Sequence, residues 1–244
     1  MTIRDNSLDR FLEVLPKNQH ANRSRFPGQY QIIQRIDHCF VTAGKHLSYL
    51  KPVLVGPLFL RCQYAYKTAA GMTLAGQVAE SFVMTRSCLE YAGYALAIFA
   101  DQSLDGAPTR EEVFVNRNVD NDSLKAQKTE FQVSRIRATI SNYDQKLAAN
   151  FKILYDRSIE YGHPNPYGVL TAMKMETKDD QLTLITTLAL TDDPTITMFA
   201  MQNVAQVGLT SLCIFQIMCK AKFELLGIRV EMDALKKTGT LSEG

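Results

Sequence analysis

The stretch from Gly76 to Asp101 constrains the fold more than any other part of the chain. It reads GQVAESFVMTRSCLEYAGYALAIFAD, and its apolar residues lie on almost every side of a helix. A helix that is apolar all round is stable only when neighbouring elements cover it on all sides. The sequence therefore predicts a helical bundle with this helix in its middle.

Helical periodicity extends over most of the chain. Apolar residues recur at helical spacing over residues 30–50, and residues 58–101 predict two helices that meet between Gly71 and Gly76. A long amphipathic helix begins at Asp122-Ser123. Two possibilities stay open for it, since it either breaks near Asn142 or continues as far as residue 163.

The first 26 residues predict an N-terminal arm. A short helical pattern follows Ser7, whose hydroxyl suits an N-cap. Pro16 is expected to stop this helix, since proline removes a backbone N–H and clashes with the preceding turn. Residues 18–28 then read as a basic loop.

The period changes after Pro164 and Pro166. Residues 167–190 alternate with a period of two, which predicts a β-hairpin insert with its turn at Lys178-Asp179-Asp180. Thr191-Asp192-Asp193-Pro194 is a helix start signal, and the last long helix is expected to run from there to Gly227. The predicted fold class is therefore an all-α bundle with a small β-hairpin insert before the last long helix. We expect one domain over 1–244, with a flexible polar tail at 233–244.

Composition excludes several classes of protein. The apolar fraction is 46% and the net charge is only +2, so no strong field directs the chain to nucleic acid or membranes. Five dispersed cysteines support neither a disulfide framework nor a zinc site, and a cytoplasmic location is expected. No metal and no cofactor is predicted. The most apolar window, 198–218, is interrupted by glutamines and an asparagine. It is interpreted as a buried or partner-covered helix of a homodimer, with no membrane span.

Arg157 and His163, six positions apart at the end of a helical pattern, are the first candidate site. An arginine offers two parallel charged hydrogen bonds to a phosphate, and a histidine transfers protons near neutral pH. Together they suit metal-independent cleavage of a phosphodiester. In the alternative interpretation, His163 caps the helix or holds the turn that follows it.

Four further residues are candidates for the same cleft. Arg86 and Glu90 lie four apart, hence on one helix face, in very apolar surroundings where charges must be paired. They either fix the register of the helices or line a polar cleft. Tyr155 and Ser158 flank Arg157 and are expected to contribute to that cleft.

These residues carry a resemblance over roughly residues 58–227. The motifs Arg86-x3-Glu90 and Tyr155-x2-Ser158-x4-His163-Pro164 resemble the signatures of uncharacterised bacterial helical families akin to the HEPN superfamily. In HEPN proteins an Arg-x4–6-His motif marks metal-independent ribonucleases of toxin–antitoxin and phage-defence systems, which act as dimers with facing motifs. The resemblance implies that Arg157 binds the scissile phosphate and His163 transfers the proton. At position 158 active members often carry Asn, Asp or His, whereas this chain has Ser158.

Two other functions stay open from the sequence. One is a non-enzymatic helical scaffold or interaction module, in which the same polar residues form a buried network. The other is a small-ligand sensor, for which a closed pocket lined by Arg86, Glu90 and Tyr155 would be expected.

Overall fold

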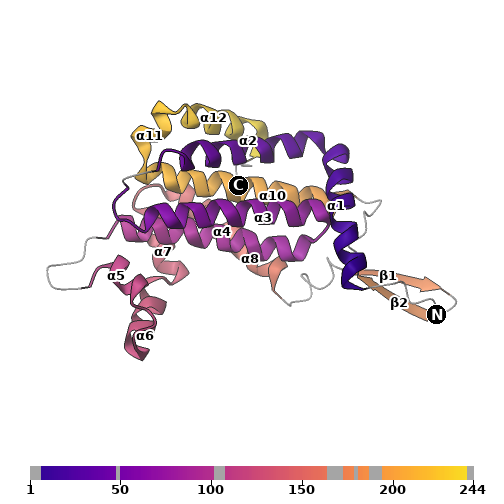
Figure 1. Cartoon of the computed structure of the whole chain (residues 1–244), viewed down its shortest axis with the longest axis horizontal. Helices are drawn as coiled ribbons and strands as arrows, with labels where there is room; N and C mark the ends of the chain where they lie inside the picture. Colours follow the sequence, from indigo (N-terminus) through magenta and orange to yellow (C-terminus); the bar gives the residue numbers. More distant parts are fainter. Residues whose placement is uncertain are drawn as a thin grey trace.

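The chain folds as an all-α helical bundle. The computed structural model describes residues 7–47, 50–101, 108–163, 173–178, 181–186 and 194–240. Its helices are α1 (Leu8–Arg25), α2 (Pro27–Gly44), α3 (Val55–Ala75), α4 (Val78–Phe99), α5 (Arg110–Val115), α6 (Asn121–Glu130), α7 (Val133–Ser141), α8 (Gln145–Gly162), α10 (Thr195–Met218), α11 (Lys220–Leu225) and α12 (Ile228–Leu235), followed by the π-helical turn η1 (Lys236–Thr240). The long helices run side by side along the molecule, and α5 and α6 project from one end (Figure 1).

Helix α4 lies in the middle of this bundle, which confirms the prediction from its all-round apolar sequence. It packs against α3, α10, α8 and α7. Helices α3 and α4 meet at Gly76, within the predicted interval, and Gly76 has a left-handed φ of 88° that suits a glycine at a helix C-cap.

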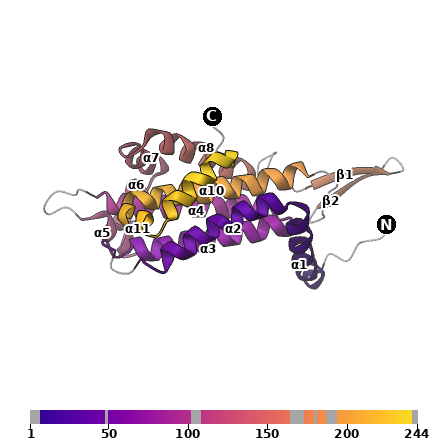
Figure 2. The ribbon, with the colours of Figure 1, turned by 90° about the horizontal axis from the view of Figure 1, so that it is seen from above.

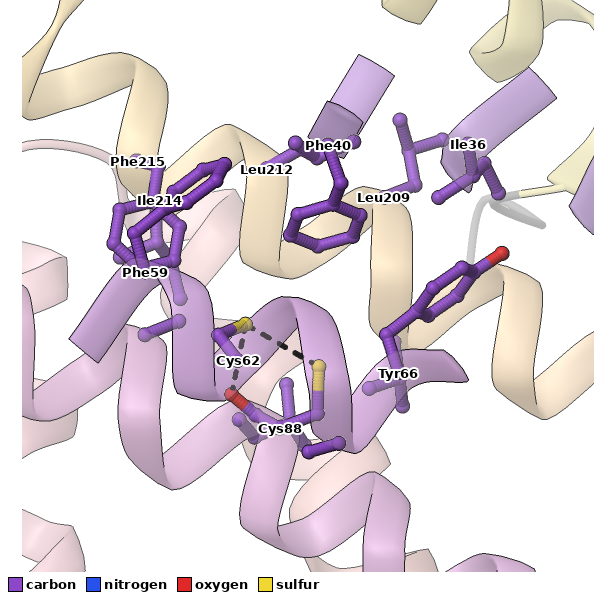
Figure 3. Close-up of a cluster of buried hydrophobic side chains, with 14 of the residues drawn as sticks. Ile36, Phe40, Phe59, Cys62, Tyr66, Cys88, Leu209, Leu212, Ile214 and Phe215 are labelled. Carbon is purple, nitrogen blue, oxygen red and sulfur yellow. Dashed lines mark hydrogen bonds between the residues drawn. The ribbon is translucent and has the colours of Figure 1, made fainter. Parts of the chain in front are cut away.

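Aromatic side chains from three helices fill the core between α2, α3 and α10 (Figure 3). The rings of Phe59 and Phe215 meet edge to face with their centroids 4.8 Å apart. Tyr66 is 1% exposed, and its hydroxyl donates to the Ile33 carbonyl at 2.9 Å. A Cβ at Gly208 would lie 2.3 Å from the Tyr66 ring, so only glycine lets α10 approach this closely.

Helix α1 continues past Pro16 to Arg25, so the predicted stop at Pro16 is wrong. Ser7 caps the helix as expected, by accepting from the Arg10 N–H. The later part of α1 is held by two buried side chains, since Asn18 and Asn22 donate to carbonyls at the end of α3 at 3.0 and 2.9 Å. Buried hydrogen bonds of this kind offset part of the cost of proline inside a helix.

The long helix predicted from Asp122-Ser123 is three shorter ones. The break near Asn142 is confirmed, and Asp144 there caps α8 by accepting from the Leu147 N–H at 2.9 Å. A second break, between α6 and α7, was not predicted; Phe131, which caps α6, is buried against the aromatic rings of Tyr94 and Phe114.

The last long helix ends earlier than predicted. Helix α10 stops at Met218 rather than at Gly227, and after the short helix α11 the chain turns back so that α12 packs on α2 (Figure 1; Figure 2 gives the view from above). The predicted tail at 233–244 begins inside α12, where Leu235 is fully buried, and helical structure continues to Thr240. Residues 241–244 lie outside the described chain.

Two strands pair between α8 and α10. Strands β1 (Met173–Lys178) and β2 (Gln181–Thr186) are antiparallel, with Met173 opposite Thr186 and Lys178 opposite Gln181. Both lie within the 167–190 segment, of which the residues outside the two strands are not described.

Helix α10 is covered by the chain itself. Among the described residues it alone is long and apolar enough to cross a membrane, but 78% of that stretch is buried inside the bundle. A core helix of a soluble protein passes the same test, so this is weak evidence for a membrane span. Since α2, α3, α4 and α8 all pack on α10, its apolar sequence no longer requires a dimer. The homodimer stays a prediction.

Candidate functional site

Four of the six candidate side chains meet where α8 crosses α4, and we call Arg86, Glu90, Tyr155 and His163 the α4–α8 quartet. Arg86 Nε donates to Glu90 Oε1 at 2.9 Å, and the Tyr155 hydroxyl donates to the same oxygen at 2.9 Å. Arg86 Nη1 lies 3.0 Å from His163 Nε2. The Arg86 guanidinium also lies over the Tyr155 ring, 5.4 Å from its centroid. One arginine therefore contacts the other three members.

Helix geometry explains this meeting. Arg86 and Glu90 are one turn apart on α4, and Tyr155 and His163 are two turns apart along α8, with His163 as its C-cap. Gly162 sets the distance between the helices, because a Cβ there would lie 3.0 Å from the Val83 backbone nitrogen. Without a side chain at 162, the end of α8 approaches α4 closely enough for His163 to contact Arg86.

The quartet is open on its outer side. His163 is exposed, and the side chains of Arg86 and Glu90 are 34% and 26% exposed. Burial alone would lower the pKa of Arg86, but the hydrogen bond and the charge of Glu90 raise it above its ordinary value. Burial, followed by the Glu90 charge, raises the pKa of Tyr155 to about 12. The arginine is therefore charged and the phenol neutral at physiological pH.

The contact with Arg86 indicates which nitrogen of His163 accepts a hydrogen bond. A guanidinium only donates hydrogen bonds, so Nε2 of His163 is the acceptor. In this tautomer the ring proton is on Nδ1. This arrangement places a proton acceptor beside a fixed cation at the protein surface, as general-base chemistry on a phosphate ester needs.

Arg157 lies in a different environment. Its guanidinium donates to Gln206 Oε1 at 2.8 Å and to Asn203 Oδ1 at 3.4 Å, both on α10, and lies over the Phe199 ring. The amide groups are neutral, and in the part of the chain described no carboxylate forms an ion pair with Arg157. Burial lowers the pKa of Arg157 from its ordinary value.

Ser158 is buried between α8 and α4. Its hydroxyl donates to the Leu154 carbonyl at 2.8 Å and lies 3.1 Å from the hydroxyl of Thr85. Asn203 Nδ2 in turn donates to that Thr85 oxygen at 3.4 Å. Arg157, Asn203, Thr85 and Ser158 thus form one chain of polar contacts, in which Arg157 is half-buried and the others are buried. We call these four residues and Gln206 the α10 network.

The pairing of Arg157 with His163, expected from the sequence, is not what the structure shows. Successive residues turn by about 100° around a helix, so six positions leave two side chains about 120° apart. Arg157 consequently contacts α10, whereas the arginine that contacts His163 is Arg86. Ser158 lies with Thr85 inside the bundle rather than in the quartet.

Sequence reasoning missed Thr85, Asn203 and Gln206. The signal that could have found Asn203 and Gln206 was present, since polar side chains inside so apolar a helix must have partners. Thr85 gave no such signal, because threonine is common in helices where its hydroxyl bonds only to its own backbone.

Among the described residues, a small cavity adjoins the quartet. The cavity beside Glu90 and Tyr155 has a volume of about 20 Å³, which is close to that of a single water molecule. The small-ligand sensor therefore gains no support at this place. Among the residues that the structure describes, no three histidine, cysteine, aspartate or glutamate side chains are arranged to hold a metal ion.

Comparison with known proteins identifies no family for this chain. No family model matches the chain, and neither a curated protein nor a solved structure matches it. The similarity to the HEPN superfamily stays a prediction from the motifs.

Proposed function

We propose that this chain is a HEPN-like helical protein that cleaves RNA without a metal ion, with the α4–α8 quartet as its centre. The observation that carries the proposal is the exposed imidazole of His163, 3.0 Å from an arginine that Glu90 and Tyr155 hold in place. A proton acceptor and a fixed cation at one surface position are the two groups that this reaction requires.

The reaction follows from the contacts. When a phosphodiester binds, its non-bridging oxygens take the Arg86 N–H that His163 accepts in the free protein. His163 Nε2 then removes the proton of the ribose 2′-hydroxyl, and that oxygen attacks the phosphorus. The bond to the 5′-oxygen breaks and this oxygen takes up a proton from water, which leaves a 2′,3′-cyclic phosphate and a 5′-hydroxyl. His163 then releases the 2′-hydroxyl proton to the hydroxide that remains. Arg86 stabilises the charge that develops on the phosphate.

In this proposal Arg86 takes the phosphate-binding role that the motif spacing gives to Arg157. Glu90 and Tyr155 act as positioning residues, since they contact Arg86 rather than the substrate. Arg157 holds α8 against α10 through Asn203 and Gln206. The homodimer and the cytoplasmic location belong to the same proposal, through the resemblance and the cysteine usage.

The test is cleavage of a mixed RNA pool by purified protein in EDTA. We expect His163→Ala to lose about 10²- to 10⁴-fold in rate, the usual contribution of a general base. Added imidazole should restore part of the rate, which a structural role of His163 would not allow. His20→Ala, at another exposed histidine, is the matched control. Equal rates for the wild type and His163→Ala would overturn the proposal.

A non-enzymatic interaction module is the second candidate. It is favoured by the fact that Arg86, Glu90 and Tyr155 already satisfy one another inside the chain. The same experiment separates the two functions. If neither protein cleaves RNA and His163→Ala melts at a clearly lower temperature, His163 is a structural residue and the module remains.

A further inference from the structure

A second polar site lies at the other end of α8 from the quartet. An open pocket of about 390 Å³ is lined by the start of α8, the end of α10, and α11 and α12. Four of its lining side chains are cations: Lys146, Lys220, Arg229 and Lys236. The one carboxylate in the lining is Asp144, which already accepts the Leu147 N–H as the cap of α8.

Two of these four cations are paired with carboxylates in the described chain and two are not. Lys146 and Lys220 form no ion pair within the described parts of the chain. Arg229 and Lys236 both lie beside Asp233, at 3.9 and 3.1 Å, and Arg229 also pairs with Glu224. Cations gathered in a concave surface raise the local potential and attract anions. The pocket is therefore a place where an anion would be stabilised.

Two amide side chains add hydrogen-bonding capacity to the same pocket. Asn150 and Gln216 are half-buried in its wall, and neither side chain has a hydrogen-bond partner in the part of the chain that the structure describes. Buried and half-buried amides are normally satisfied, so such a pair is available to a ligand. Leu147 and Ile217 supply apolar surface next to them. The lining thus combines a charged part with a neutral hydrogen-bonding part.

We propose that this pocket binds a small phosphorylated metabolite with a hydroxyl-bearing body, of the sugar phosphate class. The lysines bind the phosphates as point charges, and the amides of Asn150 and Gln216 bind the hydroxyls. The volume suits a molecule of this size. The site shares no residue with the quartet, so the inference does not depend on the RNA-cleaving function.

The test is isothermal titration of the full chain with fructose 1,6-bisphosphate and, separately, with pyrophosphate. The variant is Lys146→Gln with Lys220→Gln, because these lysines have no partner that their loss would strand. Each charged hydrogen bond lost weakens binding about tenfold or more, so we expect about 100-fold weaker binding. Lys17→Gln with Lys128→Gln removes the same charge at exposed positions outside the pocket and is the matched control.

A second variant separates the two halves of the pocket. We expect Gln216→Leu to weaken the sugar bisphosphate and to leave pyrophosphate unchanged, because only the former has hydroxyls to bind. The proposal is overturned if the wild type binds neither probe. It is also overturned if the control variant loses as much affinity as the lysine variant, since binding would then follow net charge alone.

Discussion

Arg86 on α4 and Arg157 on α8 both form hydrogen bonds between helices, but the chemical groups around them differ. Arg86 is one-third exposed and contacts a carboxylate, a phenol and an imidazole. Arg157 contacts the neutral amides of Asn203, which is fully buried, and Gln206, which is 6% exposed. A partly solvated arginine next to an exposed base can meet a substrate. Arg157 is only half-buried, but its hydrogen bonds go to neutral side chains of the bundle, so it holds α8 against α10.

The difference shows how neutral amides can hold a half-buried charge between two helices. Desolvation lowers the pKa of Arg157, and the dipoles of two amides and the face of Phe199 compensate for part of this cost. We therefore expect the two regions to respond in opposite ways to mutation. Substitutions around Arg157 should reduce stability and, under the proposed function, substitutions around Arg86 should reduce RNA cleavage.

The largest expected effect is that of Arg157→Ala. It leaves the buried oxygens of Asn203 and Gln206 without a donor, and we expect a loss of about 2–4 kcal/mol in the free energy of unfolding. Arg86→Ala should cost only about 1 kcal/mol or less, because that pair is partly exposed. Urea denaturation of both variants measures the contrast. Equal losses would contradict the distinction between the two regions.

The next effect is that of Thr85→Val. The Thr85 hydroxyl is the acceptor for Asn203 and the neighbour of Ser158, and valine keeps its shape. We expect a loss of about 1–3 kcal/mol, since a buried amide is left unsatisfied. Thr68→Val is the control, because the Thr68 hydroxyl bonds only to its own helix at the surface, and should change stability by about 0.5 kcal/mol or less. A Thr85 variant as stable as this control would show that the α10 network does not stabilise the fold.

A smaller effect concerns Tyr155 at alkaline pH. Its folded pKa, about 12, is above the ordinary value of 10.0, so the folded state holds the phenolic proton more tightly. This contribution to stability is complete below pH 10.0 and is lost as the pH rises through about 12. The difference in phenolate absorbance between wild type and Tyr155→Phe reports the titration. Glu90→Gln should move it to lower pH, and an unchanged titration would show that the carboxylate does not act on the phenol.

The smallest effect serves as a reference for an ordinary surface pair. Arg35 Nε lies 2.6 Å from Glu231 Oε1, and this hydrogen bond lowers the pKa of Glu231 from 4.5. The pair stabilises the fold above pH 4.5 and loses this contribution as the pH falls through the lowered value. Glu231→Gln should cost about 1 kcal/mol or less at neutral pH and nothing in acid. Arg86→Ala should resemble this variant in stability but not in activity.

The main features of the bundle could be predicted from the sequence, whereas the helix ends set by tertiary contacts could not. The all-round apolar pattern of α4 and the glycine at 76 are local signals, and both were interpreted correctly. Helix α1 passes Pro16 because Asn18 and Asn22 reach carbonyls of α3 more than 50 residues away. The residues that neighbour Pro16 in the sequence do not indicate these contacts with α3.

Most residues of the candidate site could be predicted from the sequence, but the contacts between them could not. Arg86, Glu90, Tyr155 and His163 meet, as a shared cleft requires, whereas Arg157 faces another helix. Spacing along one helix gives relative directions, and it says nothing about which neighbouring helix lies in each direction. The partner of His163 could therefore only come from the packing of α8 on α4.

The close approach at Gly162 has a consequence for genetics. A Cβ there would lie 3.0 Å from the Val83 backbone nitrogen, so the end of α8 and His163 would have to shift by a few tenths of an ångström relative to α4. Under the proposed function, we expect a screen for loss of RNA cleavage to recover substitutions at 162 alongside those at 163. Gly162 takes no part in the reaction, but it would be scored as essential, because His163 reaches Arg86 only when residue 162 has no side chain.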